Sequence, residues 1–195
     1  MKTVTETFDI YTFDELTEKA KRKAIDYYLE FLTDCDEFTD SCLYFLHDLF
    51  PNSKLEVEYD LGYCQGDFFN FYGNLDLGDL YKHISSKLSS KQIKFYQHVL
   101  KDWAVDCSIP SGHYTATNIS ILDEAVSDME YYGYSNIPYS DIETINTIAR
   151  DYLSEVCESL KNEGYSYFYP DIDYIQSYYN DAEYYFTAGG KPYYS

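Results

Sequence analysis

The strongest constraint on the fold lies in residues 55–61, LEVEYDL, where apolar and acidic residues alternate. Side chains of an extended strand point to opposite faces in turn, so one face of this strand is apolar and the other is charged. The charged side carries Glu56, Glu58 and Asp60. Turn-forming residues follow at 62–67, and a second apolar run extends from Phe68 to Leu77. This pattern predicts a β-hairpin whose sheet packs on a core with one face and meets water with the other.

The other periodic segments predict helices that can cover such a sheet. Apolar residues recur at helical spacing in six stretches, 12–31, 37–50, 78–88, 90–103, 140–164 and 171–179. Thr12 with Glu15 and Ser140 with Glu143 have the spacing of capping boxes, and Gly164 is expected to end the longest helix. A third strand is expected near 113–122 and a short hairpin near 188–191, while 123–139 is ambiguous.

Strands and helices do not alternate regularly along the chain. We therefore expect an α+β fold, a small antiparallel sheet covered on one face by several helices. The chain has 195 residues, 45% of them hydrophobic, which is enough for a real core. No repeat, low-complexity linker or domain boundary is evident, so the sequence predicts a single α+β domain over residues 1–195.

The charge of the chain restricts its partners. Lys and Arg number 14 against 34 Asp and Glu, which gives a formal net charge of −20 at pH 7. Such a charge repels nucleic acid, anionic lipid and acidic substrates, so we expect a cationic or neutral partner and no direct binding to nucleic acid or membrane. Residues 81–101 contain lysines and no acid. They are interpreted as a solvated helix face, although they could also neutralise an acidic neighbour in the fold or in a possible homodimer.

Catalytic motifs are absent from the sequence. There is no phosphate-binding glycine loop, no serine nucleophile elbow and no metalloprotease histidine pair. Cys35, Cys42 and His47 do not have the spacing of zinc ligands, so the cysteines are interpreted as buried free thiols. A Cys-His nucleophile pair or a carboxylate-bound metal stays open, because 5 cysteines, 4 histidines and 34 acids offer many combinations. We expect no enzymatic activity and no cofactor.

The cysteines and the hydropathy also indicate a compartment. An odd number of cysteines without an apolar N-terminal signal favours free thiols in a reducing cytoplasm. No run of about eighteen apolar residues is present, so the sequence predicts no membrane span.

Two rows of acidic residues are the candidate partner-binding sites. Side chains two apart on a strand are about 6.6 Å apart, so Glu56, Glu58 and Asp60 form a straight row that can imitate a nucleic-acid backbone. The alternative for this row is a solvated sheet face. The second row is Asp34, Asp36, Glu37 and Asp40, for which the alternative is an acidic first turn that complements a helix dipole. Tyr63 is expected to serve as an aromatic anchor, and Asp67 completes the predicted set.

Three short segments resemble a known family. They are YTFDELTEKAKRKAIDYYLE near the start, LEVEYDLGYCQGDFFNFYG in the centre and AEYYFTAGGKPY near the end. They are similar to a family of small acidic proteins of phages and mobile elements, which has a Phe-Asp-Glu-Leu helix start, a Gln-Gly-Asp-Gly hairpin and a Phe-Thr-x-x-Gly-Lys ending. Gln65, Gly66 and Asp67 match the hairpin motif, whereas Phe68 stands where the family usually has Gly or another small residue. Most members of that family are uncharacterised and some carry an antitoxin-like label, so the resemblance implies a phage or mobile-element source rather than a mechanism.

By its charge and its 25 tyrosines, the chain also resembles the DNA-mimic inhibitors of the anti-restriction and anti-CRISPR class. This resemblance implies a phage-encoded counter-defence inhibitor, an anti-CRISPR protein, acting in the host cytoplasm. It would block the basic nucleic-acid-binding cleft of a host defence protein, either a CRISPR effector or a restriction enzyme. The alternatives are an antitoxin-like module that neutralises a basic toxin, and a metal-dependent hydrolase or nuclease.

Overall fold

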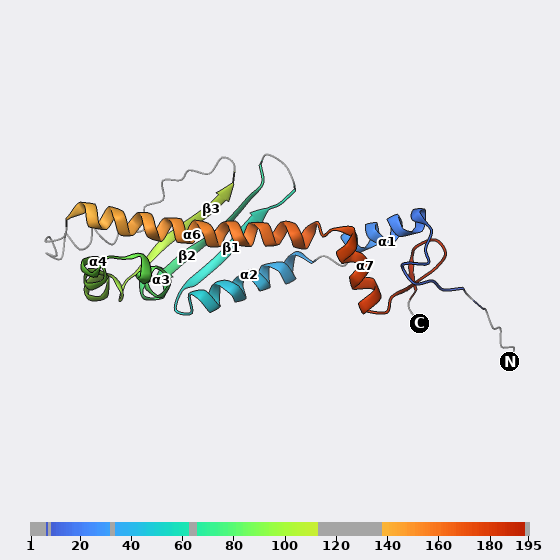
Figure 1. The fold of residues 1–195 in the computed structure, drawn as a ribbon, viewed down its shortest axis with the longest axis horizontal. Coiled ribbons are helices and arrows are strands. Elements are labelled where there is room, and N and C mark those ends of the chain that lie inside the picture. The colour runs from blue at the N-terminus through green and yellow to red at the C-terminus, as the bar shows by residue number, and fades with distance from the viewer. Residues whose placement is uncertain (1–6, 8, 32–33, 63–65, 113–137, 194–195) are drawn as a thin grey trace. The chain divides into compact units, whose positions relative to one another are not determined.

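The computed structural model describes residues 7, 9–31, 34–62, 66–112 and 138–193 (Figure 1). The contacts between residues divide the chain into two compact units. The terminal unit comprises residues 1–35 and 165–195, and the sheet unit comprises residues 36–164. The single domain expected over residues 1–195 stays a prediction.

The sheet unit is built on a three-stranded antiparallel sheet with the order β1-β2-β3. The strands are β1 Lys54–Asp60, β2 Phe68–Asp76 and β3 Ala104–Gly112. β1 and β2 form the expected hairpin, in the register that places Glu58 opposite Asn70. β3 differs from the sequence prediction, since it begins directly after the segment 90–103 that was expected to be helical. The strand predicted near 113–122 lies outside the described residues.

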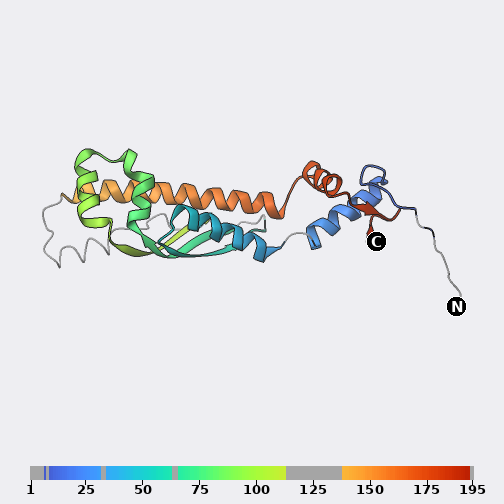
Figure 2. The same ribbon diagram turned by 90° about the horizontal axis from the view of Figure 1, so that it is seen from below.

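Helices cover one face of this sheet. The described helices that run wholly or mainly in this unit are α2 Cys35–Leu49, α3 Leu77–Ile84, α4 Ser90–Phe95 and α6 Tyr139–Phe168, with the helical turns η1 Ser85–Lys87 and η2 Tyr96–Leu100. α2 and α6 lie over the same side of the sheet (Figures 1 and 2). Phe38 of α2 meets Tyr59 of β1 edge to face with ring centroids 5.2 Å apart. The α+β class, with an antiparallel sheet covered by helices, is therefore confirmed.

The core of the sheet unit lies between the strands and these helices. Phe69, Phe71 and Leu75 of the central strand are fully buried. α6 turns a row of apolar residues at helical spacing toward them, among them Leu153 and Cys157. The Cys157 thiol donates to the carbonyl oxygen of Ile109 at 2.9 Å, so the helix contacts the sheet backbone itself.

α6 extends further than the sequence predicts. Gly164, expected to end the helix, is buried inside it. A Cβ atom at Gly164 would lie 2.4 Å from a methyl carbon of Leu61 and 2.9 Å from the ring of Phe38, so this glycine allows close packing and does not terminate the helix. α6 ends at Phe168, two residues before Pro170, because a proline disfavours helical backbone in the residue before it.

The terminal unit has an aromatic core. Its elements are α1 Glu18–Phe31, α7 Ile172–Asp181, β4 Tyr185–Phe186 and β5 Pro192–Tyr193. Phe13 stacks on Tyr179 with centroids 5.5 Å apart, and the Tyr179 hydroxyl donates to the carbonyl oxygen of Ala24 at 2.7 Å. Tyr11 pairs with Phe186 through two backbone hydrogen bonds of 2.9 and 2.8 Å. The short helix and the hairpin predicted near residues 171–191 are confirmed.

The first helix begins later than predicted. The backbone N–H of Thr12 does donate to the carboxylate of Glu15 at 2.9 Å, as in a capping box. These residues form a turn, however, and α1 begins only at Glu18. Thr17 supplies a cap in their place, since its hydroxyl accepts a hydrogen bond from the Ala20 N–H at 3.3 Å.

Candidate partner-binding surface

The first acidic row lies on the outer face of the sheet, which we define as the face opposite α2 and α6. Leu55, Val57 and Tyr59 point toward the helices and are half-buried. The alternate residues of β1 point the other way and are exposed: Lys54, Glu56, Glu58 and Asp60. β3 adds the exposed Asp106 to the same sheet, opposite Asn74 of β2. The strand geometry that the sequence predicted for this row is therefore present.

Neutral side chains of the central strand hold the carboxylates of this face. The hydroxyl of Tyr72 donates to Glu56 Oε2 at 3.0 Å, and the amide of Asn70 donates to Glu58 Oε1 at 2.9 Å. Ser108 of β3 in turn donates to the amide oxygen of Asn70 at 3.2 Å. The hydrogen bond to Glu56 raises the pKa of Tyr72, because ionised tyrosine would lose that bond and repel the carboxylate. These contacts orient the carboxylates without neutralising them.

The outer face carries almost no compensating positive charge. Lys54 is the single base within the three strands, and it stands at the start of β1. Neighbouring carboxylates of the row are about 6.6 Å apart along the strand, a spacing at which their fields add outside the sheet. The row can therefore attract a cationic surface.

The second acidic row does not join the first. Asp36, Glu37 and Asp40 are exposed on α2. That helix turns Phe38 toward the covered face of the sheet, so the other sides of the helix face away from it. The two rows therefore lie on opposite layers of the sheet unit. Asp34 is exposed and belongs to the terminal unit, where its backbone N–H donates to the Tyr167 hydroxyl at 3.3 Å.

Asp67 and Tyr63 are the two remaining residues of the predicted set, and neither belongs to the exposed row on β1. Asp67 is only 6% exposed, and its carboxylate oxygen would lie 3.9 Å from a Cβ atom at Gly62. This burial fits turn chemistry and leaves little of Asp67 exposed, and its role in partner binding stays a prediction. Tyr63 lies outside the described residues.

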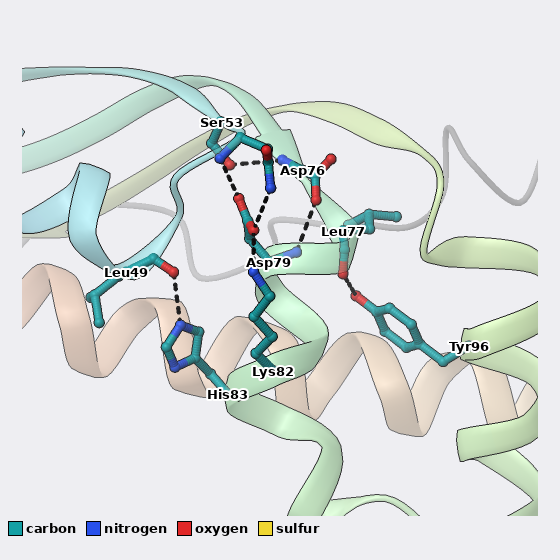
Figure 3. Close-up of polar contacts among 9 residues, drawn as sticks. Leu49, Ser53, Asp76, Leu77, Asp79, Lys82, His83 and Tyr96 are labelled. Atoms are coloured by element: carbon teal, nitrogen blue, oxygen red, sulfur yellow. Dashed lines mark hydrogen bonds and ion pairs between the residues drawn. The ribbon is translucent and has the colours of Figure 1, made fainter.

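A buried polar cluster that the sequence did not predict joins the turn before β1, the end of β2 and α3 (Figure 3). The side chain of Asp79 is fully buried and accepts hydrogen bonds from Asn52 N at 2.7 Å, Asn52 Nδ2 at 2.9 Å and Lys82 Nζ at 2.8 Å. Burial on its own raises the pKa of Asp79, but the hydrogen bonds from Lys82 and Asn52 together outweigh it and leave the pKa lowered. Asp76, which caps α3 by accepting from the Asp79 N–H, is the sequence signal that could have indicated this cluster.

The cluster in Figure 3 is structural in character. Nε2 of His83, one turn after Asp79, lies 2.9 Å from the carbonyl oxygen of Leu49, and the ring stacks on Tyr152. The hydroxyl of Tyr96 donates to the carbonyl of Leu77 at 2.9 Å. Each polar group here meets a protein partner, so the arrangement fixes the start of α3.

The lysines of residues 81–101 partly neutralise acids of the same unit. Lys82 pairs with Asp79 at 2.8 Å, and Lys91 pairs with Asp141 of α6 at 2.5 Å. Neutralisation within the fold, one of the alternatives for this segment, therefore holds for these two lysines.

Metal ligands and reactive thiols were the other candidates. Within the part of the chain that the structure describes, no three His, Cys, Asp or Glu side chains gather as a metal site. Burial raises the pKa of Cys42, Cys107 and Cys157 to about 12, which keeps these thiols protonated, whereas Cys35 is exposed. None of the helices in the described ranges is long and apolar enough to cross a membrane.

No protein-family model, no curated protein and no solved structure matches the chain. The resemblance to the phage and mobile-element family therefore stays a prediction. Two of the three segments that carry it meet in the terminal unit, where the rings of Phe13 and Phe186 lie 6.2 Å apart edge to face. Both segments contribute aromatic residues to the core of the terminal unit, so packing alone is a sufficient reason for these residues.

Proposed function

We propose that this protein is a non-enzymatic inhibitor that presents the outer face of its sheet in place of nucleic acid. Its partner would be the basic nucleic-acid-binding cleft of a host defence protein, a CRISPR effector or a restriction enzyme, which makes it a phage counter-defence protein of the anti-CRISPR kind. The observation that carries the proposal is the exposed row Glu56, Glu58 and Asp60 on one sheet face, in which hydrogen bonds orient Glu56 and Glu58.

The physical basis is electrostatic competition. A net charge of −20 raises the rate of encounter with a basic cleft, and a fixed row of carboxylates can replace the phosphates that the cleft normally holds. The neutral donors Tyr72 and Asn70 limit the freedom of Glu56 and Glu58 before binding, which lowers the entropy lost in the complex.

Two charge-reversal variants of equal size test the proposal. One replaces Glu56, Glu58 and Asp60 by lysine, and the other replaces Asp36, Glu37 and Asp40 by lysine. Each removes three acids, so both change the net charge equally, but only the first alters the outer face. We expect the first variant to weaken binding to the defence protein by about 100-fold and the second to change it by about threefold or less.

The measurement is capture of partners from bacterial lysate, followed by affinity and DNA-cleavage assays on the captured nuclease. Raising sodium chloride from about 0.05 M to about 0.5 M should weaken the wild-type complex strongly, because salt screens exposed charges. Equal loss of binding in both variants, or binding indifferent to salt, would contradict the proposal.

The antitoxin-like alternative uses the same surface and differs in its partner. Capture of one small basic toxin, with no nuclease bound, would favour it. A metal-dependent hydrolase would instead show activity that requires a divalent ion and that a single Asp or Glu substitution abolishes.

A further inference from the structure

The geometry points to the way in which the target is held. We propose that residues 54–58 of β1, at the edge that does not pair with β2, accept an extended segment of the partner protein as a fourth strand, and that this segment alternates lysine or arginine with apolar residues. The inference rests on the proposed function and deepens it by specifying the partner's chemistry.

β1 is an edge strand whose inner side is incompletely covered. In the order β1-β2-β3, no other strand of the described residues pairs with its outer edge. Leu55 and Val57 are only half-buried, whereas the inward residues of the neighbouring β2, such as Phe69 and Phe71, are fully buried. The apolar layer therefore thins out toward the edge of the sheet, where a further strand would complete it.

An apolar groove lies beside this edge, between the second half of α2 and the start of β1. It encloses about 370 Å³ and is lined by Leu43, Tyr44, Leu46, His47, Phe50, Ser53, Lys54 and Leu55. Tyr44 at its rim is 78% exposed, and the adjacent Phe45 is 40% exposed. Exposed aromatic residues around an apolar groove are typical of protein-binding surfaces. The groove can receive the inward-pointing side chains of an added strand.

Charge selects the residues on the other side of that strand. Side chains of an added strand that point outward would lie directly beside Glu56 and Glu58, as cross-strand neighbours. Lysine or arginine is favourable there, and a carboxylate is not. A second copy of this chain paired through β1 would set like charges against each other, so the edge discriminates against self-pairing.

Two peptides of identical composition test this recognition. The probe is acetyl-Lys-Val-Lys-Val-Lys-Val-Lys-amide, and the control is acetyl-Lys-Lys-Val-Val-Val-Lys-Lys-amide, which has the same charge without the alternation. We expect the alternating peptide to bind on the order of tenfold more tightly, because its pattern alone fits both faces of the sheet. It should also slow amide hydrogen exchange in residues 54–58. Equal affinities, or unchanged exchange at 54–58, would overturn the inference.

A pair of exposed tyrosines supplies the matched protein variants. Tyr44→Ser removes an aromatic side from the groove, whereas Tyr139→Ser removes a tyrosine of similar exposure, 72%, that does not line it. Tyr44→Ser should weaken binding of the alternating peptide, and Tyr139→Ser should not. The fluorescence of Trp103 reports whether the sheet unit is folded in each variant. Equal effects of the two variants would count against the groove.

The outcomes separate this inference from the proposed function. If lysines at 56, 58 and 60 abolish binding of the nuclease while the two peptides bind with equal affinity, the proposed role of the acidic face is supported and strand addition is wrong. If the alternating peptide binds selectively and no nuclease is captured, strand addition stands and the proposed function fails. A dimer in sedimentation that the alternating peptide dissociates would show that β1 pairs with itself, which overturns the proposed occupant.

Discussion

Acidic residues of this protein have two different roles, and the burial of the side chain decides between them. Glu58 and Asp79 are both acids followed by hydrophobic residues, so the local sequence does not distinguish them. Glu58 is exposed on the sheet, while the Asp79 side chain is fully buried and accepts three hydrogen bonds from Asn52 and Lys82. An exposed carboxylate is available to a partner, and a buried carboxylate with its acceptors filled stabilises the fold.

Asp79→Asn should destabilise the sheet unit by about 2 kcal/mol, because the introduced amide would direct a donor at a donor of Asn52 or at Lys82. The measurement is urea unfolding followed by the fluorescence of Trp103, the single tryptophan of the chain. Its backbone lies beside α3, where the Leu77 N–H donates to the Trp103 carbonyl at 2.9 Å. Asp48→Asn, at an exposed position of α2, is the control and should change the midpoint little.

The pH dependence of this effect has a defined sign. The folded-state pKa of Asp79 is lowered from 3.8, so its stabilisation is complete above that pH and is lost as the pH falls through the folded value. The difference between wild type and Asp79→Asn should therefore shrink below about pH 4. A difference that stays constant under acid would contradict the assignment.

Among helices and strands, the sequence predicts those that are defined by a periodic pattern of neighbouring residues. The β1-β2 hairpin follows from alternation and a turn, and α2, α6 and α7 follow from helical spacing. β3 does alternate, with Val105, Cys107 and Ile109 inward, but its pairing with β2 comes from contacts far away in the sequence, and Pro110 weakens its strand pattern.

The same limit applies to the candidate surface. Alternation in β1 is enough to place Glu56, Glu58 and Asp60 on one face. It cannot show that the acids of α2 lie on the opposite layer, because that depends on which side of the sheet the helix covers. The burial of Asp79 likewise depends on Asn52, which belongs to another part of the chain.

The joint between the β4-β5 turn and α1 provides a prediction about elements. Gly190 has φ 82°, and a Cβ atom there would lie 2.1 Å from the carbonyl oxygen of Ala20 in α1. Gly190→Ala should therefore lower the free energy of unfolding of the terminal unit by about 1–3 kcal/mol, because it introduces both backbone strain and a clash with the backbone of α1. Hydrogen exchange of α1 and α7 measures this loss.

The adjacent glycine is a matched control for that substitution. A Cβ atom at Gly189 would meet only Thr187 Oγ1, at 3.8 Å, an ordinary contact. Gly189→Ala should leave exchange in α1 almost unchanged. Equal acceleration of exchange by both variants would argue against close packing at Gly190.

For the molecule as a whole, alkaline pH should be destabilising. Burial raises the pKa of Cys42, Cys107 and Cys157 from 9.0 to about 12, and burial next to other tyrosines raises that of Tyr28 from 10.0 to about 12. These groups contribute stability that is complete below the unfolded values and is lost as the pH rises toward 12. The urea midpoint should fall progressively above pH 9.

High salt keeps this measurement specific to the buried groups, since it screens the growing repulsion among surface acids as lysines lose their charge. The double variant Cys107→Ala and Cys157→Ala should flatten the decline near pH 9 to 10, because it removes two of the buried thiols. A midpoint that stays level up to pH 11 would contradict the role of buried thiols and tyrosines.

The pairing of Tyr11 with Phe186 has a consequence for synthesis on the ribosome. Residues 36–164 find all the partners of their own unit within that stretch, so they can fold while the chain is still growing. Phe13 and Ala24, although made earlier, must wait for Tyr179 and Phe186 to emerge before their core can close. α1 and Phe13 are thus translated before the residues that complete their core, and they acquire these native contacts only after α7 and β4 have been made.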